Sequence, residues 1–303
     1  MGTPEFSVPI LNMLIENYNV VGVVTQPDKL VGRKKVLTPS PIKKVAMANN
    51  IPVITPVKIK TEYEEILLLK PDIIVTCAFG QIVPKIVLDY PKYGCINVHA
   101  SLLPKYRGGA PIQRAIMSGE EQTGVTIMYM NEGLDTGDMI SKKEIIINMD
   151  DNYETVCKKL MECGTELLKT VLPNILKNKV SREKQDDSKS TYAPIITRED
   201  EKIDFNKNVK EIYNKIRALS PIPASYFILD GKQVKVYSSR FDKKNINSEV
   251  GIITHIYDDG IAISARDGEI IITDIKVEGK TRIKVKEYLN GKNKNELLMK
   301  DVK

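Results

Sequence analysis

The 303-residue sequence has only two histidines, four cysteines and no tryptophan. The cysteines stand at positions 77, 95, 157 and 163, so none of them forms a Cys-x-x-Cys pair. Because structural zinc sites need several Cys or His ligands at short, regular spacings, we expect no metal site. Unpaired cysteines of this kind are typical of reduced, mostly buried thiols, which predicts a cytoplasmic protein.

Long apolar runs and targeting signals are also missing. No stretch approaches the roughly 18 consecutive apolar residues of a transmembrane helix, so we expect no membrane partner. The N-terminus lacks the basic region followed by an apolar region that marks a secretory signal. Neither Gly-x-Gly-x-x-Gly nor the phosphate-loop pattern is present, which argues against a nicotinamide cofactor.

The net charge of +6 is concentrated at one end of the chain. Residues 207–303 carry 19 Lys and Arg against 13 Asp and Glu, whereas the first 206 residues carry 26 of each. A basic module joined to a neutral one favours a polyanionic partner such as RNA or DNA. A solvated lysine-rich surface explains the same charge equally well, so both interpretations stay open at this point.

The pattern of apolar residues predicts an α/β domain followed by a β-rich one. Near-continuous apolar strands alternate with helical stretches, which is typical of a doubly wound, mostly parallel sheet. The predicted strands cover residues 20–26, 53–54, 72–78, 95–99, 125–130 and 140–147. The predicted helices cover residues 8–17, 41–49, 62–69 and 152–178.

A polar stretch separates this region from five short strands with Asp-Gly turns, which predict a small closed barrel. We therefore expect a first domain over residues 1–180, a linker over 181–206 and a basic domain over 207–303.

One segment concentrates residues suited to acid–base chemistry. Asn97 and His99 lie two residues apart in a predicted strand, so both side chains project from one face near its carboxyl end. An amide can donate to a developing oxyanion, and a neutral imidazole can accept a proton near neutral pH. The carboxylate of Asp135, in a downstream Gly-rich loop, can orient the imidazole. The same residues could instead be structural: a hydrogen-bonded histidine at a strand end and an aspartate in an ordinary turn.

This segment resembles the formyltransferases that use 10-formyltetrahydrofolate. Those enzymes share an Asn-x-His-x-Ser-Leu-Leu-Pro run and a later Leu-Asp-x-Gly loop, which here are residues 97–104 and 134–137. The resemblance runs from residue 2 to about residue 290. It implies a formyltransferase fold in which Asn97 holds the oxyanion, His99 moves a proton and Asp135 orients His99.

The resemblance also implies a co-substrate, 10-formyltetrahydrofolate, and no metal. The folate is expected along two segments whose backbone groups can read a pterin edge. Their residues are Phe79, Gly80, Gln81, Ile82, Ser101, Leu102, Leu103 and Pro104.

Further runs, at residues 2–6, 25–28 and 109–114, are similar to the members that formylate methionine on initiator tRNA. The implied reaction is attack of the methionine α-amine on the formyl carbon. In those members a basic loop reaches the tRNA acceptor end, and here it implies contacts from Arg33, Lys34 and Lys35. The basic C-terminal region resembles their OB-like domain, which would hold the tRNA backbone.

Two other functions stay open on the sequence. One is a folate-dependent formyltransferase that acts on a sugar-nucleotide amine, and the other is a non-catalytic nucleic-acid-binding protein. We expect a monomer. Family members carry an apolar strand directly before Gly-Thr-Pro, where Met1 stands here. We therefore expect the first strand to be missing from this sequence and translation to begin upstream. The run Thr3-Pro4-Glu5 separately predicts that Thr3 caps a helix.

Overall fold

The computed structural model describes residues 1–32, 34–245, 248–291 and 293–302. The contacts divide the chain into two compact units. Unit 1 contains Met1–Pro111, Gln122–Ile146 and Cys157–Pro194. Unit 2 contains Ile112–Glu121, Ile147–Val156 and Ile195–Lys303. These boundaries differ from the predicted ones, because the segment expected as a linker over residues 181–206 is divided between the units.

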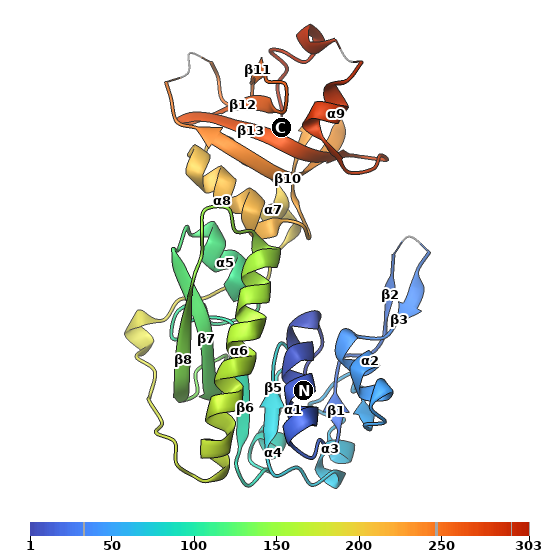
Figure 1. Ribbon diagram of the computed structural model, residues 1–303, viewed down its shortest axis with the longest axis vertical. Helices are drawn as coiled ribbons and strands as arrows, with labels where there is room; N and C mark the ends of the chain where they lie inside the picture. The colour runs from blue at the N-terminus through green and yellow to red at the C-terminus, as the bar shows by residue number, and fades with distance from the viewer. Residues whose placement is uncertain (33, 246–247, 292, 303) are drawn as a thin grey trace. The chain divides into compact units, whose positions relative to one another are not determined.

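Unit 1 is an α/β fold (Figure 1). Its strands are β1 (Val23–Val24), β2 (Lys29–Val31), β3 (Val36–Thr38), β4 (Val53–Ile54), β5 (Ile74–Thr76), β6 (Cys95–His99), β7 (Gln122–Tyr129) and β8 (Met139–Ile146). Its helices are η1 (Glu5–Ser7), α1 (Val8–Asn17), α2 (Pro41–Ala48), α3 (Glu64–Leu68), α4 (Lys85–Leu88) and η2 (Asp187–Lys189). Helices α5 (Pro111–Met117) and α6 (Tyr153–Leu176) contribute residues to both units.

Helices cover both faces of β1, as a doubly wound fold requires. Val23 packs into a cluster with Leu11 of α1, whereas its neighbour Val24 packs into a cluster with Ile66 of α3. Successive strand residues point to opposite faces, so these two valines bury both sides of the strand. Each is at most 4% exposed, and each burial contributes about 1.5–3 kcal/mol. The predicted helix-covered sheet is confirmed.

The strand directions are more mixed than predicted. β1 pairs with β4 and β5 pairs with β6 in parallel. β7 is antiparallel to both β6 and β8, so the predicted mostly parallel sheet is wrong at this edge. The connection from β7 to β8, over residues 130–138, is shorter than the dozen or more residues that a parallel crossover needs.

The chain start occupies the gap between β1 and β5. The backbone N–H of Gly2 donates to Val24 O at 3.0 Å, and the N–H of Cys77 donates to Met1 O at 2.9 Å. Residues 1 and 2 therefore bridge β1 and the end of β5 through backbone hydrogen bonds. The predicted N-cap is wrong: Thr3 donates instead to Phe79 O at 3.0 Å, and α1 begins only at Val8, after the short η1 helix.

Helix α6 packs closely against the strand that carries Asn97 and His99. A Cβ added at Gly164 would lie 3.1 Å from Val98 Cγ1 and 3.5 Å from Val125 Cγ1. A side chain at Gly164 would therefore push the helix away from β6 and β7. Because Val98 alternates with Asn97 and His99 along the strand, α6 supports the face of β6 opposite to theirs.

Unit 2 is built around an antiparallel sheet. Its strands are β9 (Ser225–Leu229), β10 (Lys232–Asp242), β11 (Ile253–Ile256), β12 (Ile261–Ala265), β13 (Gly268–Val277) and β14 (Ile283–Lys284). Its other helices are α7 (Arg198–Glu201), α8 (Val209–Leu219), α9 (Val285–Leu289) and η3 (Lys294–Glu296). The sheet order is β11-β12-β13-β10-β9, with β14 also paired to β13.

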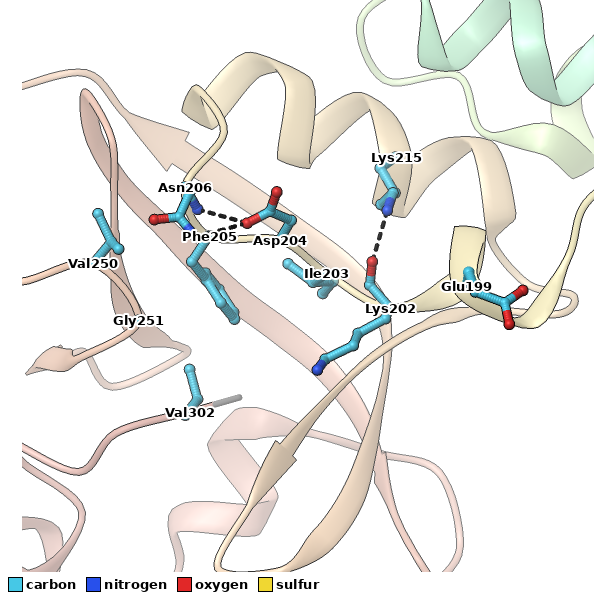
Figure 2. Close-up of a pocket in the computed structure, with 10 residues that line it drawn as sticks. All are labelled: Glu199, Lys202, Ile203, Asp204, Phe205, Asn206, Lys215, Val250, Gly251 and Val302. Carbon is cyan, nitrogen blue, oxygen red and sulfur yellow. Dashed lines mark hydrogen bonds between the residues drawn. The ribbon is translucent and has the colours of Figure 1, made fainter.

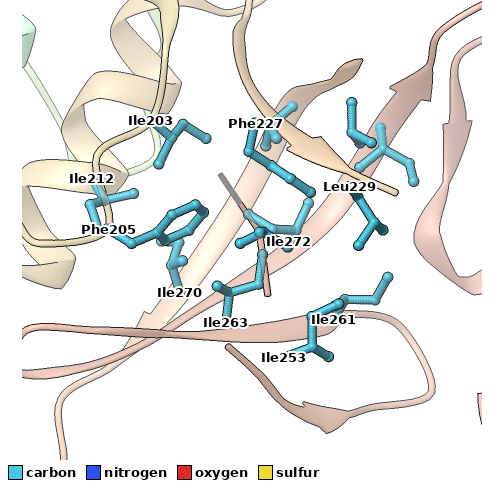
Figure 3. Packing of buried hydrophobic residues seen from close by; sticks show 14 of the residues in the cluster. Ile203, Phe205, Ile212, Phe227, Leu229, Ile253, Ile261, Ile263, Ile270 and Ile272 are labelled. Atoms are coloured by element: carbon cyan, nitrogen blue, oxygen red, sulfur yellow. The ribbon is translucent and has the colours of Figure 1, made fainter. Parts of the chain in front are cut away.

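The core of unit 2 lies between α8 and this sheet. Ile212 of α8 packs in one cluster with Phe205, Phe227 and Ile270 (Figure 3). An antiparallel, β-rich C-terminal domain is therefore confirmed. Across the described residues the strand path is open from β11 to β9, so hydrogen bonds do not close the predicted barrel. The helix covers apolar sheet surface that a closed barrel would bury among its own strands.

Within the described ranges, no helix combines the length and the apolar character that a membrane span requires.

Candidate active site

The three predicted catalytic residues lie together in unit 1. Strand β6 ends at His99, and Asn97 lies two residues earlier on the same face. The loop after β7 brings Asp135 to both: its Oδ2 lies 3.6 Å from His99 Nδ1, and its Oδ1 lies 3.4 Å from Asn97 Nδ2. Three residues separated by up to 38 positions therefore form one cluster at the carboxyl end of β6.

The second nitrogen of His99 fixes where its proton lies. Nε2 is 3.0 Å from the carbonyl oxygen of Tyr106. A carbonyl only accepts, so this geometry assigns a proton to Nε2 and leaves Nδ1 facing the Asp135 carboxylate. The ring is 5% exposed. Both nitrogens face acceptors, so a second proton taken up at Nδ1 would be held by a negative charge.

Asp135 is held both at its carboxylate and at its backbone carbonyl. Its Oδ2 accepts a hydrogen bond of 2.9 Å from the backbone N–H of Gly108. Its own carbonyl oxygen accepts a 2.8 Å bond from Gln185 Nε2. Asp135 has a φ of 53°, in the left-handed region that L-residues other than Asn and Asp seldom adopt. The surrounding hydrogen bonds stabilise this backbone conformation and so set the direction of the carboxylate.

The Asn97 amide is oriented by β5. Thr76 Oγ1 donates to Asn97 Oδ1 at 2.9 Å, which leaves the amide N–H₂ turned toward Asp135. The 3.4 Å contact with Asp135 is long for an N–H···O hydrogen bond. The amide can therefore exchange it for a stronger acceptor, such as a developing oxyanion.

The two predicted folate segments leave the same edge of the sheet. β5 and β6 are parallel with Thr76 opposite Asn97, so residues 79–82 and 101–104 both follow the carboxyl ends of their strands. This edge is where ligands bind in open α/β sheets. The structure thus places both segments beside the Asn97–His99–Asp135 cluster.

Several side chains in these segments are engaged in supporting the loops. The carbonyl of Phe79 accepts from Gln26 Nε2 at 3.2 Å, and the Phe79 ring is buried. Gln81 accepts from the N–H of Ile59 and donates to a carbonyl at position 56. Ser101 is fully buried and donates to Lys105 O. Leu103 is also buried, in a small cluster behind the second segment.

The remaining four residues of these segments are open to a ligand. Gly80 and Ile82 are exposed, and Leu102 and Pro104 are half-buried. Gly80 has a φ of +84°, which requires glycine and leaves its backbone uncovered. A flat heterocycle therefore has backbone groups and apolar side chains, rather than charged ones, to contact here.

Thr126 supports the second segment and was not predicted. This fully buried residue of β7 donates to Ser101 O at 2.7 Å and accepts from the N–H of Leu103 at 3.1 Å. Its signal in the sequence is a hydroxyl within the apolar run 125–130. Gln185, which bonds to the Asp135 carbonyl, and Arg107, which bonds to Gln185, carried no comparable signal in the sequence.

The predicted tRNA loop is a hairpin of β2 and β3. Lys34 and Lys35 lie in its turn and are exposed, and Arg33 lies outside the described residues. Asp28, at the base, forms an ion pair of 2.8 Å with Lys43 of α2. Anchored at its base, the hairpin presents positive charge at its turn.

Unit 2 contains a separate pocket of about 430 Å³ (Figure 2). Phe205 and Val302 contribute apolar surface to it, and Lys202 and Lys215 contribute amines. Burial lowers the pKa of Lys215, whose Nζ donates to Lys202 O at 2.6 Å. This amine is therefore used within the protein. The pocket holds none of the three candidate catalytic residues.

The cluster combines an amide, an imidazole and a carboxylate at the carboxyl edge of an α/β sheet, which are groups that acid–base group transfer can use. Residues 1–172 match the model of the formyl transferase family, and residues 195–293 match that of the formyl transferase C-terminal domain. The chain belongs to the formyl transferase family, as its resemblance predicted.

Curated relatives match almost the whole chain. It is 49% identical over 295 residues to the methionyl-tRNA formyltransferase of Bacillus subtilis, covering 96% of this chain and 93% of the relative. It is 50% identical over 295 residues to the methionyl-tRNA formyltransferase of Bacillus licheniformis, with the same coverage of both chains.

Solved structures with the same fold include two formyltransferases with other acceptors. WlaRD, a sugar 3N-formyl transferase solved in the presence of dTDP and 5-N-formyl-THF, has a TM-score of 0.66 at 25% identity, covering 92% of this chain and 97% of that one. The N-formyltransferase from Helicobacter canadensis, in complex with folinic acid and dTDP-3-aminofucose, has a TM-score of 0.67 at 25% identity, covering 89% and 96%.

Proposed function

We propose that this protein transfers a formyl group from 10-formyltetrahydrofolate to the α-amine of methionine on initiator tRNA. The observation that carries the chemistry is the cluster of Asn97, His99 and Asp135, with its 3.6 Å Asp135–His99 contact. The near-full-length similarity to methionyl-tRNA formyltransferases supports the choice of acceptor. We also propose that the protein acts in the cytoplasm as a monomer.

In this proposal each residue has one role. Nucleophilic attack by the amine on the formyl carbon forms a C–N bond and moves negative charge onto the formyl oxygen. The Asn97 amide, held by Thr76, donates to that oxygen. His99 accepts the proton that the amine loses, and Asp135 holds the ring and the charge that it gains. The bond between the formyl carbon and the folate nitrogen then breaks, and the proton passes from His99 to that leaving nitrogen.

The folate-binding role of residues 79–82 and 101–104 is part of the same proposal. Gly80 offers uncovered backbone, and Ile82 and Leu102, in the two segments, offer apolar side chains that are exposed and half-buried. Peptide N–H and C=O groups match the donor and acceptor edge of a pterin. Gln81, by contrast, is proposed to act through the loop, because both ends of its amide are already bonded.

For the tRNA, we propose contacts from Arg33, Lys34 and Lys35 and from the basic C-terminal region. The exposed lysines in the hairpin turn and the excess of 19 basic over 13 acidic residues in 207–303 both suit a phosphate backbone. A sugar-nucleotide amine is the second candidate acceptor, favoured by the fold shared with WlaRD. A small acceptor of that kind would need neither feature.

An acceptor comparison tests this proposal. Purified protein would be incubated with 10-formyltetrahydrofolate and either charged initiator tRNA, charged elongator tRNA or a dTDP-amino sugar. We expect transfer to charged initiator tRNA at least 100-fold more efficiently than to the sugar. Transfer to the sugar alone would establish the second candidate, and no transfer to any acceptor would contradict both.

A further inference from the structure

We propose that Gln185 and Arg107 are positioning residues for the acid–base pair, and that residues 183–193 act as a strap that holds the site. The inference rests on the proposed function. The sequence predicted this stretch as part of a solvated linker. In the structure, however, Gln185 is 6% exposed and its amide is bonded at both ends.

Gln185 holds the backbone on which Asp135 stands. Its Nε2 donates to Asp135 O and to Gly137 O, both at 2.8 Å. The amino group of one side chain therefore binds two carbonyl oxygens, two residues apart, in the Asp135 loop. Because Asp135 adopts a φ of 53°, the direction of its carboxylate depends on this backbone staying in place.

Arg107 holds Gln185 in the orientation that this requires. Its Nε and Nη2 donate to Gln185 Oε1 at 3.0 and 2.7 Å, and Nη2 also donates to Asp187 Oδ1 at 2.7 Å. The Arg107 side chain is 2% exposed. A guanidinium only donates, so it forces the Gln185 oxygen toward itself and the Gln185 amino group toward the Asp135 loop.

The same strap sets the backbone that contacts His99. Tyr106 N–H donates to Thr191 Oγ1 at 2.8 Å, and Arg107 exchanges backbone bonds with Thr191 and Ala193 at 2.9 and 2.7 Å. The carbonyl of Tyr106 accepts a hydrogen bond from His99 Nε2. Two residues later, the backbone N–H of Gly108 donates to Asp135 Oδ2.

The two partners of the acid–base pair are thus aligned by one short segment. Residues 106–108 contact both His99 and Asp135, and the strap fixes this segment from behind while Gln185 fixes the Asp135 loop. Displacement of a reacting group by about 1 Å can lower a rate by about 100-fold. We infer that loosening the strap lowers the rate of the chemical step without removing a group that touches substrate.

The test compares two changes at Gln185 with a control on the same strap. Gln185→Leu removes both ends of the amide. Gln185→Glu keeps the acceptor for Arg107 but turns an oxygen toward the carbonyls of Asp135 and Gly137. We expect kcat for formyl transfer to fall at least 10-fold in both variants, with KM for both substrates within twofold. Lys184→Leu, at an exposed neighbour, should match the wild type.

The Glu variant separates the two possible roles of Gln185. If Gln185 served only to accept hydrogen bonds from Arg107, the Glu variant would keep wild-type kcat, which would overturn the inference. A double variant gives the second criterion. In an Asp135→Asn background, Gln185→Leu should lower kcat by less than twofold, because its effect passes through Asp135. Multiplicative effects would show a general structural role and overturn the inference.

Thr191→Val keeps the inference testable if the Gln185 variants do not fold. Thr191 is exposed, and valine removes only the acceptor for Tyr106 N–H. We expect a threefold or greater loss of kcat with an unchanged melting temperature; an unchanged kcat would count against the strap. Activity of the wild-type protein separates the two claims. An inactive wild type contradicts the proposed function, whereas an active wild type with indifferent variants contradicts only the positioning role.

Discussion

Asp135 faces His99 at 3.6 Å while accepting a 2.9 Å hydrogen bond from the backbone N–H of Gly108. The carboxylate is therefore tied more tightly to the backbone than to the imidazole. This geometry suits a group that must orient the ring and then hold a charge that appears only during the reaction. The longer contact can shorten when Nδ1 gains its proton.

Asp135→Asn should lower kcat by roughly 10²–10⁴-fold, which is the usual contribution of a positioned acid–base group. The amide cannot hold the charge on His99, although it can still occupy the same space. Steady-state kinetics with both substrates would measure the effect, and KM for the folate should change less than threefold. Asp138→Asn, a half-buried change in the same loop, serves as the control. A kcat above half the wild-type value would show that Asp135 does not take part in the reaction.

Thr126→Val should destabilise the protein by about 1–3 kcal/mol, because it leaves Ser101 O and the N–H of Leu103 buried without their partner. The same change should loosen residues 101–104 and raise the Kd for the folate several-fold. Urea unfolding and a folate titration would measure the two effects. Thr170→Val, at an exposed position on α6, should alter neither. Tight folate binding by a destabilised Thr126 variant would show that the 101–104 segment is not a folate contact.

Unit 2 should become less stable in acid, because the stabilising Arg114–Asp200 ion pair is lost when Asp200 takes up a proton. The hydrogen bond from the Arg114 guanidinium lowers the pKa of Asp200 to about 2. Because the folded pKa lies below the unfolded value of about 3.9, the pair stabilises the fold above pH 4 and loses its contribution as the pH falls toward 2. Asp200→Asn should cost about 1–2 kcal/mol at pH 7, after allowance for solvent screening.

The cost of Asp200→Asn should shrink between pH 4 and pH 2, which thermal melts of the variant and the wild type at pH 7 and pH 3 would detect. Asp258→Asn is the control, since Asp258 is 96% exposed in its pair with Lys294. A cost of Asp200→Asn that stays constant with pH would show that the ion pair does not act through this titration.

Replacing both Lys34 and Lys35 with alanine should raise KM for tRNA by roughly fivefold and leave KM for the folate unchanged. Loss of phosphate contacts should also reduce the dependence of KM on salt concentration. A salt series with the double variant would measure both, with Lys169→Ala, an exposed lysine of α6, as the control. A raised KM with an unchanged salt dependence would indicate that these lysines do not contact phosphate.

Much of the fold could be predicted because it is encoded locally. The apolar run 95–99 predicted β6 with both of its ends, and the helical period predicted α1 over its observed bounds. The alternation of side chains along β6 also predicted that Asn97 and His99 share a face. Pairing direction was less accessible between β6 and β7, because their connection over residues 100–121 is long enough for either direction.

The support of the site could not be predicted for a related reason. Gln185 reaches Arg107 and Asp135 across 78 and 50 positions of sequence. Its surroundings in the chain are polar and charged, so composition indicated a solvated linker. Only the fold shows that this glutamine is buried and bonded at both ends of its amide. The hairpin over residues 29–38 was likewise hidden, because four of its apolar side chains face solvent: Leu30, Val31, Val36 and Leu37.

The central claim is that Asn97 and His99 carry out formyl transfer. Single-turnover transfer from 10-formyltetrahydrofolate to charged initiator tRNA, measured for the wild type and for Asn97→Ala and His99→Ala, tests it most directly. We predict that each variant reacts at least about 100-fold more slowly than the wild type while binding the folate with a similar Kd. Transfer by the His99 variant at the wild-type rate would contradict the claim.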